Sequence, residues 1–159
     1  MKITSCMTAV LLSMGASVAL AAEPHAHHAP VFNFDKRIVL SLTDSERAMI
    51  LQEMHLFLAG VQQLTGALGK QDMAAAAQSA RKLGLVMAHD VPPSLRAKLP
   101  AEFRQLGSSV HRDFDQIAMD AETLKDVSHT LGQVSATLQK CASCHATYQI
   151  KQPVLHLKR

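Results

Sequence analysis

The run Cys141-Ala142-Ser143-Cys144-His145, near the C-terminal end, constrains the fold and the chemistry of this chain more than any other feature. The pattern C-x-x-C-H is typical of a site where a c-type haem is attached. Two thiols three positions apart share one face of a helix, so each can form a thioether to one vinyl edge of the same porphyrin. His145 follows at once and is placed to bind the iron as its proximal ligand. The motif therefore predicts one covalently bound haem c, held by Cys141, Cys144 and His145.

Other chemistries that use a cysteine pair fit the rest of the chain less well. A thioredoxin-like C-x-x-C lies near a βαβ pattern, and the sequence has no strand-rich segment. A structural zinc site needs four ligands, but there is no second C-x-x-C and the other histidines are scattered. A disulfide between Cys141 and Cys144 is the alternative that the sequence leaves open.

The first 21 residues have the pattern of a secretory signal peptide. Lys2 supplies the positive charge, residues 7–20 are almost entirely apolar or small, and Ala19-Leu20-Ala21 is typical of a cleavage site. The apolar stretch is short for a membrane span, although an uncleaved anchor is the alternative. We therefore expect residues 1–21 to be removed and the mature chain to be periplasmic, with no membrane span.

The charge balance and the pattern of polar residues exclude several classes of function. The chain has 16 Lys and Arg against 13 Asp and Glu, with no continuous basic patch. Nucleic acids and anionic membranes are therefore not expected partners. No paired carboxylates or Ser/His/Asp set indicates acid–base catalysis, and the acidic residues suit helix caps and solvated faces. We expect a protein that is not an enzyme.

The segment from 22 to 42 is expected to be a tail followed by an extended lead. His25, His27 and His28 lie close together in the tail. Such a group can bind a divalent metal, whereas a solvated tail is the simpler interpretation. Residues 31–42 are expected to be an extended lead that packs on the domain.

Two helices are predicted in the first half of a domain that spans residues 43–152. The first begins at a capping box, Thr43-Asp44-Ser45-Glu46, and carries apolar residues at three-four spacing as far as Gly69, which suits its C-cap. Asp72 suits the N-cap of the second helix, which we expect to run to about Met87. A junction this short makes the two helices antiparallel.

Two more helices complete the prediction of an all-α, antiparallel four-helix bundle with covalently attached haem. After a proline-containing loop, Pro100 fits the first position of the third helix. A break at about residues 121–126 precedes the fourth helix, and Pro153 ends it, so residues 153–159 form a C-terminal tail. The predicted inner face of the fourth helix comprises Leu131, Val134 or Ser135, Leu138, Cys141, His145 and Tyr148.

Over residues 43–151 the chain resembles the class II cytochromes c, the cytochrome c′ family. Those proteins are exported and carry C-x-x-C-H near the C-terminus, on the last of four helices, whereas class I cytochromes c carry it near the N-terminus. The resemblance implies that a residue of the first helix faces the iron opposite the proximal histidine. That residue is a methionine in low-spin members and a non-ligating apolar residue in gas-binding members. Family members also often pair through their first two helices, so a homodimer is an expected possibility.

The resemblance points to Met54 as the sixth ligand of the iron. Counting back from Gly69, the family position falls at or next to Met54, which shares a stripe with Ile50 and Phe57. Met49 is displaced from that stripe. Simple core packing of Met54 beside an open iron is the alternative. The other candidate donors are His111, His55, Met87 and Met49.

One position departs from the family pattern. Many class II members have a basic residue four positions after the haem histidine, near the propionates, and this chain has Gln149 there. Lys151, Lys140 and Arg47 are the candidates for the missing charge.

Three functions follow as hypotheses. The first is a periplasmic carrier of single electrons between redox partner proteins, with iron held by His145 and Met54. The alternative is a five-coordinate haem protein that binds NO or CO in a pocket lined by Ile50, Leu51, Phe57 and Leu58. The third is metal handling by the three tail histidines.

Overall fold

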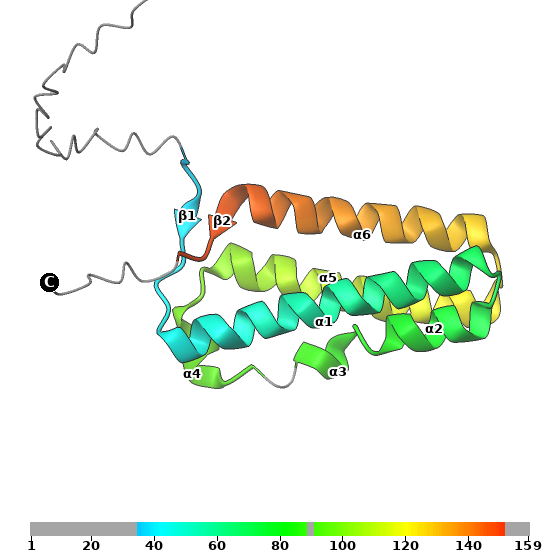
Figure 1. Cartoon of the computed structure of the whole chain (residues 1–159), viewed down its shortest axis with the longest axis horizontal. Helices are drawn as coiled ribbons and strands as arrows, with labels where there is room; N and C mark the ends of the chain where they lie inside the picture. Colours follow the sequence, from blue (N-terminus) through cyan, green and yellow to red (C-terminus); the bar gives the residue numbers. More distant parts are fainter. Residues whose placement is uncertain (1–34, 89–90, 152–159) are drawn as a thin grey trace, which may run out of the picture. The chain divides into compact units, whose positions relative to one another are not determined.

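The computed structural model describes residues 35–88 and 91–151, which form a mostly helical unit (Figure 1). The predicted signal peptide (residues 1–21), the histidine tail and the C-terminal tail (residues 153–159) lie outside the described residues. In chain order the elements are β1 (Ile38–Val39), α1 (Asp44–Gly69), α2 (Met73–Arg81), α3 (Leu85–Ala88), α4 (Pro93–Lys98), α5 (Ala101–Thr123), α6 (Val127–Thr147) and β2 (Tyr148–Gln149). The all-α class is therefore confirmed, apart from a parallel pair of two-residue strands.

Two hydrophobic clusters hold these elements together. Helix α2 packs against α1 and α5, and α5 packs against α6. The larger cluster lies between these helices and includes Leu64, Phe114 and Ile117, none of which is more than 1% exposed. A smaller cluster joins Leu40, Ile50, Leu95 and Leu99. Because Leu40 belongs to it, the described part of the predicted lead does pack on the helices.

Side-chain caps begin three of the helices. The capping box of α1 is present: the Glu46 N–H donates to Thr43 Oγ1 (3.3 Å) and the Thr43 N–H donates to Glu46 Oε2 (2.9 Å). Asp72 caps α2 and Asp126 caps α6 through their carboxylates. Helix α1 runs as far as Gly69, as predicted, but its predicted C-cap is wrong, because Lys70 is the C-cap and Gln71 takes the left-handed conformation, with φ of 58°.

The second predicted helix is interrupted. Helix α2 ends at Arg81 and α3 begins at Leu85, because the carboxylate of Asp115 from α5 enters the gap. Its Oδ2 accepts a hydrogen bond from the Leu85 N–H (3.0 Å). A Cβ on Gly84 would lie 1.8 Å from Asp115 Oδ1. Any side chain at position 84 would therefore displace the Asp115 carboxylate from another helix.

Replacing Gly84 with alanine is expected to destabilise the fold by about 1–3 kcal/mol, because Asp115 must move and its bond to α3 is strained. Gly132, in α6, is the matched control, since nothing lies within 4 Å of its Cβ position. Alanine there is expected to raise the free energy of unfolding by up to about 1 kcal/mol. Urea titration of both variants measures the difference, and equal effects would contradict this role of Asp115.

The predicted inner face of α6 is partly wrong. Leu131 and Leu138 are 45% and 41% exposed, whereas Thr130 and Thr137 are fully buried. The threonine hydroxyls donate to carbonyls one turn back, at 2.8 Å and 3.0 Å, so both buried hydroxyls have a hydrogen-bond partner. The face that meets the other helices therefore runs through Thr130, Val134 and Thr137 toward the two cysteines.

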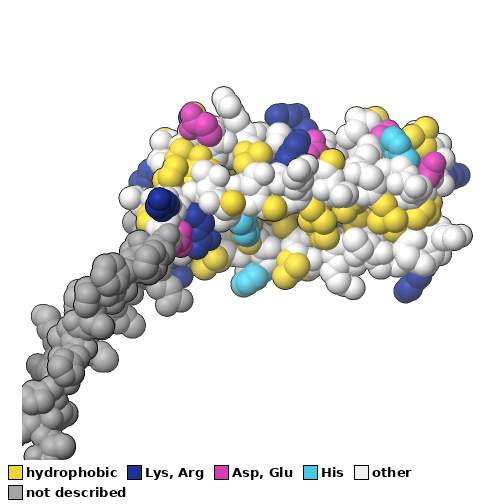
Figure 2. Space-filling model, turned by 90° about the horizontal axis from the view of Figure 1, so that it is seen from above, with side chains coloured by type: hydrophobic (Ala, Val, Ile, Leu, Met, Phe, Trp, Pro, Cys, Tyr) yellow, Lys and Arg dark blue, Asp and Glu magenta, His cyan; other side chains and the backbone are white. Residues whose placement is uncertain are grey.

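Apolar side chains also reach the surface. Leu58 and Leu56 of α1 are 71% and 49% exposed, and Val86 of α3 is 65% exposed. Figure 2 shows hydrophobic side chains gathered in bands along one face of the helices. Within the described residues, no helix has both the length and the apolar character needed to cross a membrane.

Candidate functional site

A cavity of about 820 Å³ lies against α1, the α3–α4 region, α5 and the C-terminal half of α6. Its volume falls toward the upper end of the range of ~300–1,000 Å³ that is usual for cofactor sites. Most of its lining is apolar and includes Leu95 of α4, Phe103 and Val110 of α5, and Phe57 of α1. The site is therefore large enough, and apolar enough, for a macrocycle.

Cys141 and Cys144 both line this cavity. They continue the buried face of α6, are half-buried, and carry free thiols. Burial raises the pKa of the Cys141 thiol, and the charge of Asp113 contributes to the rise. Burial also raises the pKa of the Cys144 thiol, with a contribution from Cys141. Both side chains are therefore held as neutral thiols against an apolar wall.

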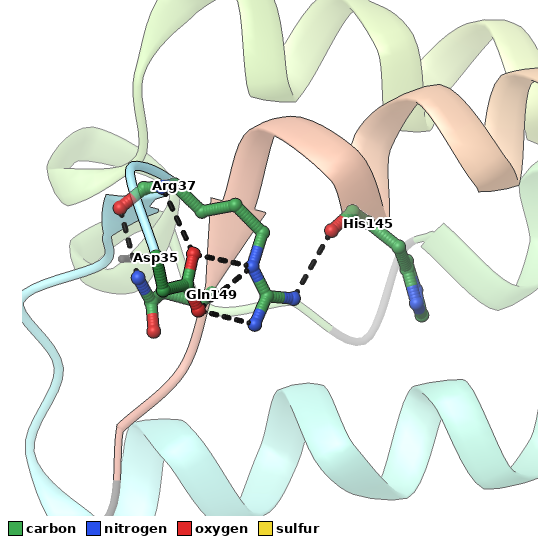
Figure 3. A network of polar contacts seen from close by, with 4 residues as sticks. All are labelled: Asp35, Arg37, His145 and Gln149. Carbon is green, nitrogen blue, oxygen red and sulfur yellow. Dashed lines mark hydrogen bonds and ion pairs between the residues drawn. The ribbon is translucent and has the colours of Figure 1, made fainter. Parts of the chain in front are cut away.

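His145 does not line the cavity, although it follows Cys144 directly. The residue is exposed, and its ring points away from the Asp35–Arg37 pair (Figure 3). Its backbone carbonyl accepts a hydrogen bond from Arg37 Nη1 at 3.2 Å. Because the ring is exposed, it can change rotamer without disturbing the packed core.

Met54 lines the same cavity as the two cysteines, from α1. It is half-buried, whereas Met49, which also contributes to the lining, is 40% exposed. Met87, from α3, is a third thioether at this cavity. The structure thus brings Met54 together with Cys141 and Cys144, with two other methionines nearby.

His111 is a buried structural residue with both ring nitrogens engaged. It is 4% exposed, its Nδ1 lies 2.8 Å from the Leu83 carbonyl, and its Nε2 lies 3.3 Å from Glu53 Oε1. Burial lowers the pKa of His111, but the bonds to Glu53 and to the Leu83 carbonyl outweigh it, so the net pKa is raised. His111 also lines the cavity, and both of its ring nitrogens have protein partners in this structure. His55 is exposed and lies outside the cavity lining.

The raised pKa of His111 predicts a pH dependence of stability. Its contribution is complete below the unfolded value of about 6.5 and is lost as the pH rises through the raised folded value. We expect the free energy of unfolding to fall over that window in the native protein and to change less in H111Q. Urea titrations from pH 6 to pH 9 measure it, with H129Q, an exposed histidine, as the control. A slope that survives in H111Q would contradict the assignment.

One of the three basic residues expected from sequence lines the cavity. Lys140 is part of the lining and forms an ion pair with Asp113 (2.6 Å). Arg47, which lies beside Asp44, and Lys151 are not part of the lining. Arg96 and Arg104 do line the cavity, and sequence analysis missed both.

The donor set suits a bound macrocycle better than a bare ion. Among the residues that the structure describes, no three His, Cys, Asp or Glu side chains are grouped to hold a metal. Two thiols and three thioethers instead line a large apolar space, and three basic residues are also part of its lining. No protein-family model, curated protein or solved structure matches the chain. The motif and the cavity therefore carry the functional argument.

Proposed function

We propose that the protein is an exported c-type cytochrome that carries single electrons, with one haem c attached through Cys141 and Cys144. The observation that carries this proposal is the cavity of about 820 Å³ that both thiols of the C-x-x-C-H motif line. A chance C-x-x-C-H on a helix has no reason to face an apolar space of this size. Burial of both cysteines on the same wall supports a shared, apolar partner.

The packing of the helices supports the antiparallel four-helix bundle of the class II cytochromes c. In this proposal α1, α2, α5 and α6 are the four helices, and α3 and α4 belong to the connection between α2 and α5. The contacts of α1 with α2, of α2 with α5 and of α5 with α6 fit this order. Cys141 and Cys144 then lie on the last helix, as the resemblance implies.

Each site residue has a role in this proposal. Cys141 and Cys144 would each hold the haem through a thioether, formed by net addition of S–H across a vinyl group. His145 would supply one iron ligand from the exposed side of α6, and Met54 would supply the second from α1. When bound, the haem iron exchanges one electron between ferric and ferrous states, and His/Met ligation raises its reduction potential. The apolar lining excludes water from the group.

Binding of NO or CO to five-coordinate iron is the second candidate, and the apolar lining near Met54 favours it. Ile50 and Phe57 line the cavity, as expected for a gas pocket. Leu51 and Leu58, however, are 37% and 71% exposed and are not part of the lining, so that part of the prediction is wrong. The exposed apolar residues of α1 and α3 are instead available to a redox partner or a second copy of the chain.

Optical and electron paramagnetic resonance spectra of the purified ferric protein test the proposal, with carbon monoxide added after reduction. Low-spin iron with slow or absent carbon monoxide binding supports the electron carrier. High-spin iron that binds carbon monoxide readily supports the gas-binding candidate. A protein that holds no haem on a denaturing gel would contradict both.

A further inference from the structure

The segment Asp35–Leu40 lies beside the C-terminal end of α6, although more than 100 residues separate them (Figure 3). Strand β1 pairs in parallel with β2, with Ile38 opposite Tyr148. The Leu40 N–H donates to the Gln149 carbonyl at 3.0 Å. This pairing places the side chain of Arg37 next to the last turn of α6, which contains His145.

Two residues hold Arg37, one at its side chain and one at its backbone. Its Nε and Nη2 donate to the Asp35 carboxylate at 3.0 Å and 2.7 Å. The Arg37 carbonyl accepts a hydrogen bond from Gln149 Nε2 at 2.9 Å. The bond to Arg37 also lowers the pKa of Asp35 to about 2, so this ion pair persists into strongly acidic solution. The remaining Nη1 is therefore presented in one orientation, toward the carbonyl of His145.

The His145 carbonyl is one of the last four carbonyls of α6. The last four carbonyls of an α-helix have no N–H one turn ahead to bond with. In α6 the Cys144 carbonyl accepts from the Tyr148 N–H, and the His145 carbonyl accepts from Arg37. A positive charge at a helix C-terminus is favourable, and a charged donor forms a stronger hydrogen bond than a neutral one.

We propose that Arg37, which directly precedes β1, is a positioning residue that holds the last turn of α6 so that His145 can bind the haem iron. This inference rests on the proposed function, in which His145 is the proximal ligand. Because the His145 ring is exposed, core packing does not orient it, and the backbone of the last turn sets where the ring reaches. The segment that precedes the first helix thereby becomes part of the cofactor site.

The first test is amide hydrogen exchange in the purified, haem-loaded protein and in its Arg37→Ala variant. We expect the Leu40 and Tyr148 amides to exchange about fivefold faster in the variant, since local opening is no longer opposed by the Arg37 bond. Arg81→Ala is the matched control, because Arg81 forms an exposed ion pair with Glu122, distant in sequence from the C-terminal end of α6. Exchange rates in Arg37→Ala equal to those of the control would overturn the proposal that Arg37 holds the last turn of α6.

The second test measures the iron ligand itself. Acid titration, followed by the optical spectrum, gives the pH at which His145 is displaced from iron. In Arg37→Ala we expect this midpoint to rise by about half a unit, because the ligand is less well held, while the haem stays covalently attached. Gln149→Ala, which removes the second anchor of Arg37, should shift it in the same direction. A wild-type midpoint in both variants would overturn the positioning role.

The two proposals fail in different ways. If the wild-type protein carries no covalent haem, the proposed function fails, and with it the action of Arg37 on an iron ligand. The exchange comparison still decides, on that same protein, whether Arg37 holds the end of α6. If haem is attached and Arg37→Ala matches the wild type in both measurements, only the positioning role of Arg37 is contradicted.

Discussion

Replacing both Cys141 and Cys144 with serine is expected to leave no haem on the polypeptide in a denaturing gel. Serine keeps the size and the position of each side chain on the cavity wall but cannot form a thioether. The loss should be complete, since no other described cysteine is available at the cavity. Haem staining of the gel and the pyridine haemochrome spectrum measure attachment directly.

Ser143→Ala is the matched control for this experiment. Ser143 lies between the two cysteines, and its exposed hydroxyl donates to the Gln139 carbonyl within the helix (3.0 Å). The variant therefore changes the motif without removing a thiol and should retain haem at the wild-type level. Haem that remains attached to the double serine variant would rule out the thioether assignment.

The second large effect is expected from Met54→Leu. If the Met54 sulfur is the sixth ligand, leucine fills the same space without a donor, and low-spin iron becomes five-coordinate and high-spin. If Met54 occupies the iron in all but about 1% of the molecules, it lowers the apparent affinity for carbon monoxide by ~100-fold. Met54→Leu should therefore bind carbon monoxide about 100-fold more tightly than the native protein. Carbon monoxide titration of the reduced protein, with the ferric spectrum, measures both changes.

Met49→Leu separates Met54 from its neighbour on the same helix. Met49 also lines the cavity but is more exposed, so its removal should leave the iron low-spin. A high-spin spectrum in Met49→Leu together with an unchanged one in Met54→Leu would transfer the ligand role to Met49. An unchanged spectrum in both variants would exclude α1 methionines as ligands.

Local sequence signals predicted the starts of two helices well. Thr43 and Asp72 are N-caps because their side chains bond to backbone groups within three residues, so the information lies in a short stretch of sequence. The apolar stripe of α1 was also predicted from its three-four spacing, and Ile50, Leu64 and Leu68 are buried. The two cysteines and Met54 line one cavity, and the role of Met54 as a ligand, which the family resemblance implied, stays a prediction.

The features that were not predicted from sequence depend on contacts between distant parts of the chain. The break before α3 comes from Asp115 on another helix, which no pattern around Gly84 reveals. The inner face of α6 was misassigned because threonine counts as polar, although its hydroxyl can bond within the helix and leave its methyl group to pack. Arg96, Arg104 and Glu53 reach the cavity through the tertiary fold alone.

The pairing of β1 with β2 also sets an order of events in folding. Strand β1 is made first, but its partner follows the last helix, so the pair can close only when nearly the whole chain is available. Contacts between such distant residues form late, because the loop between them must first be ordered. We therefore expect β1 and β2 to pair late in folding, after the helices between them have assembled.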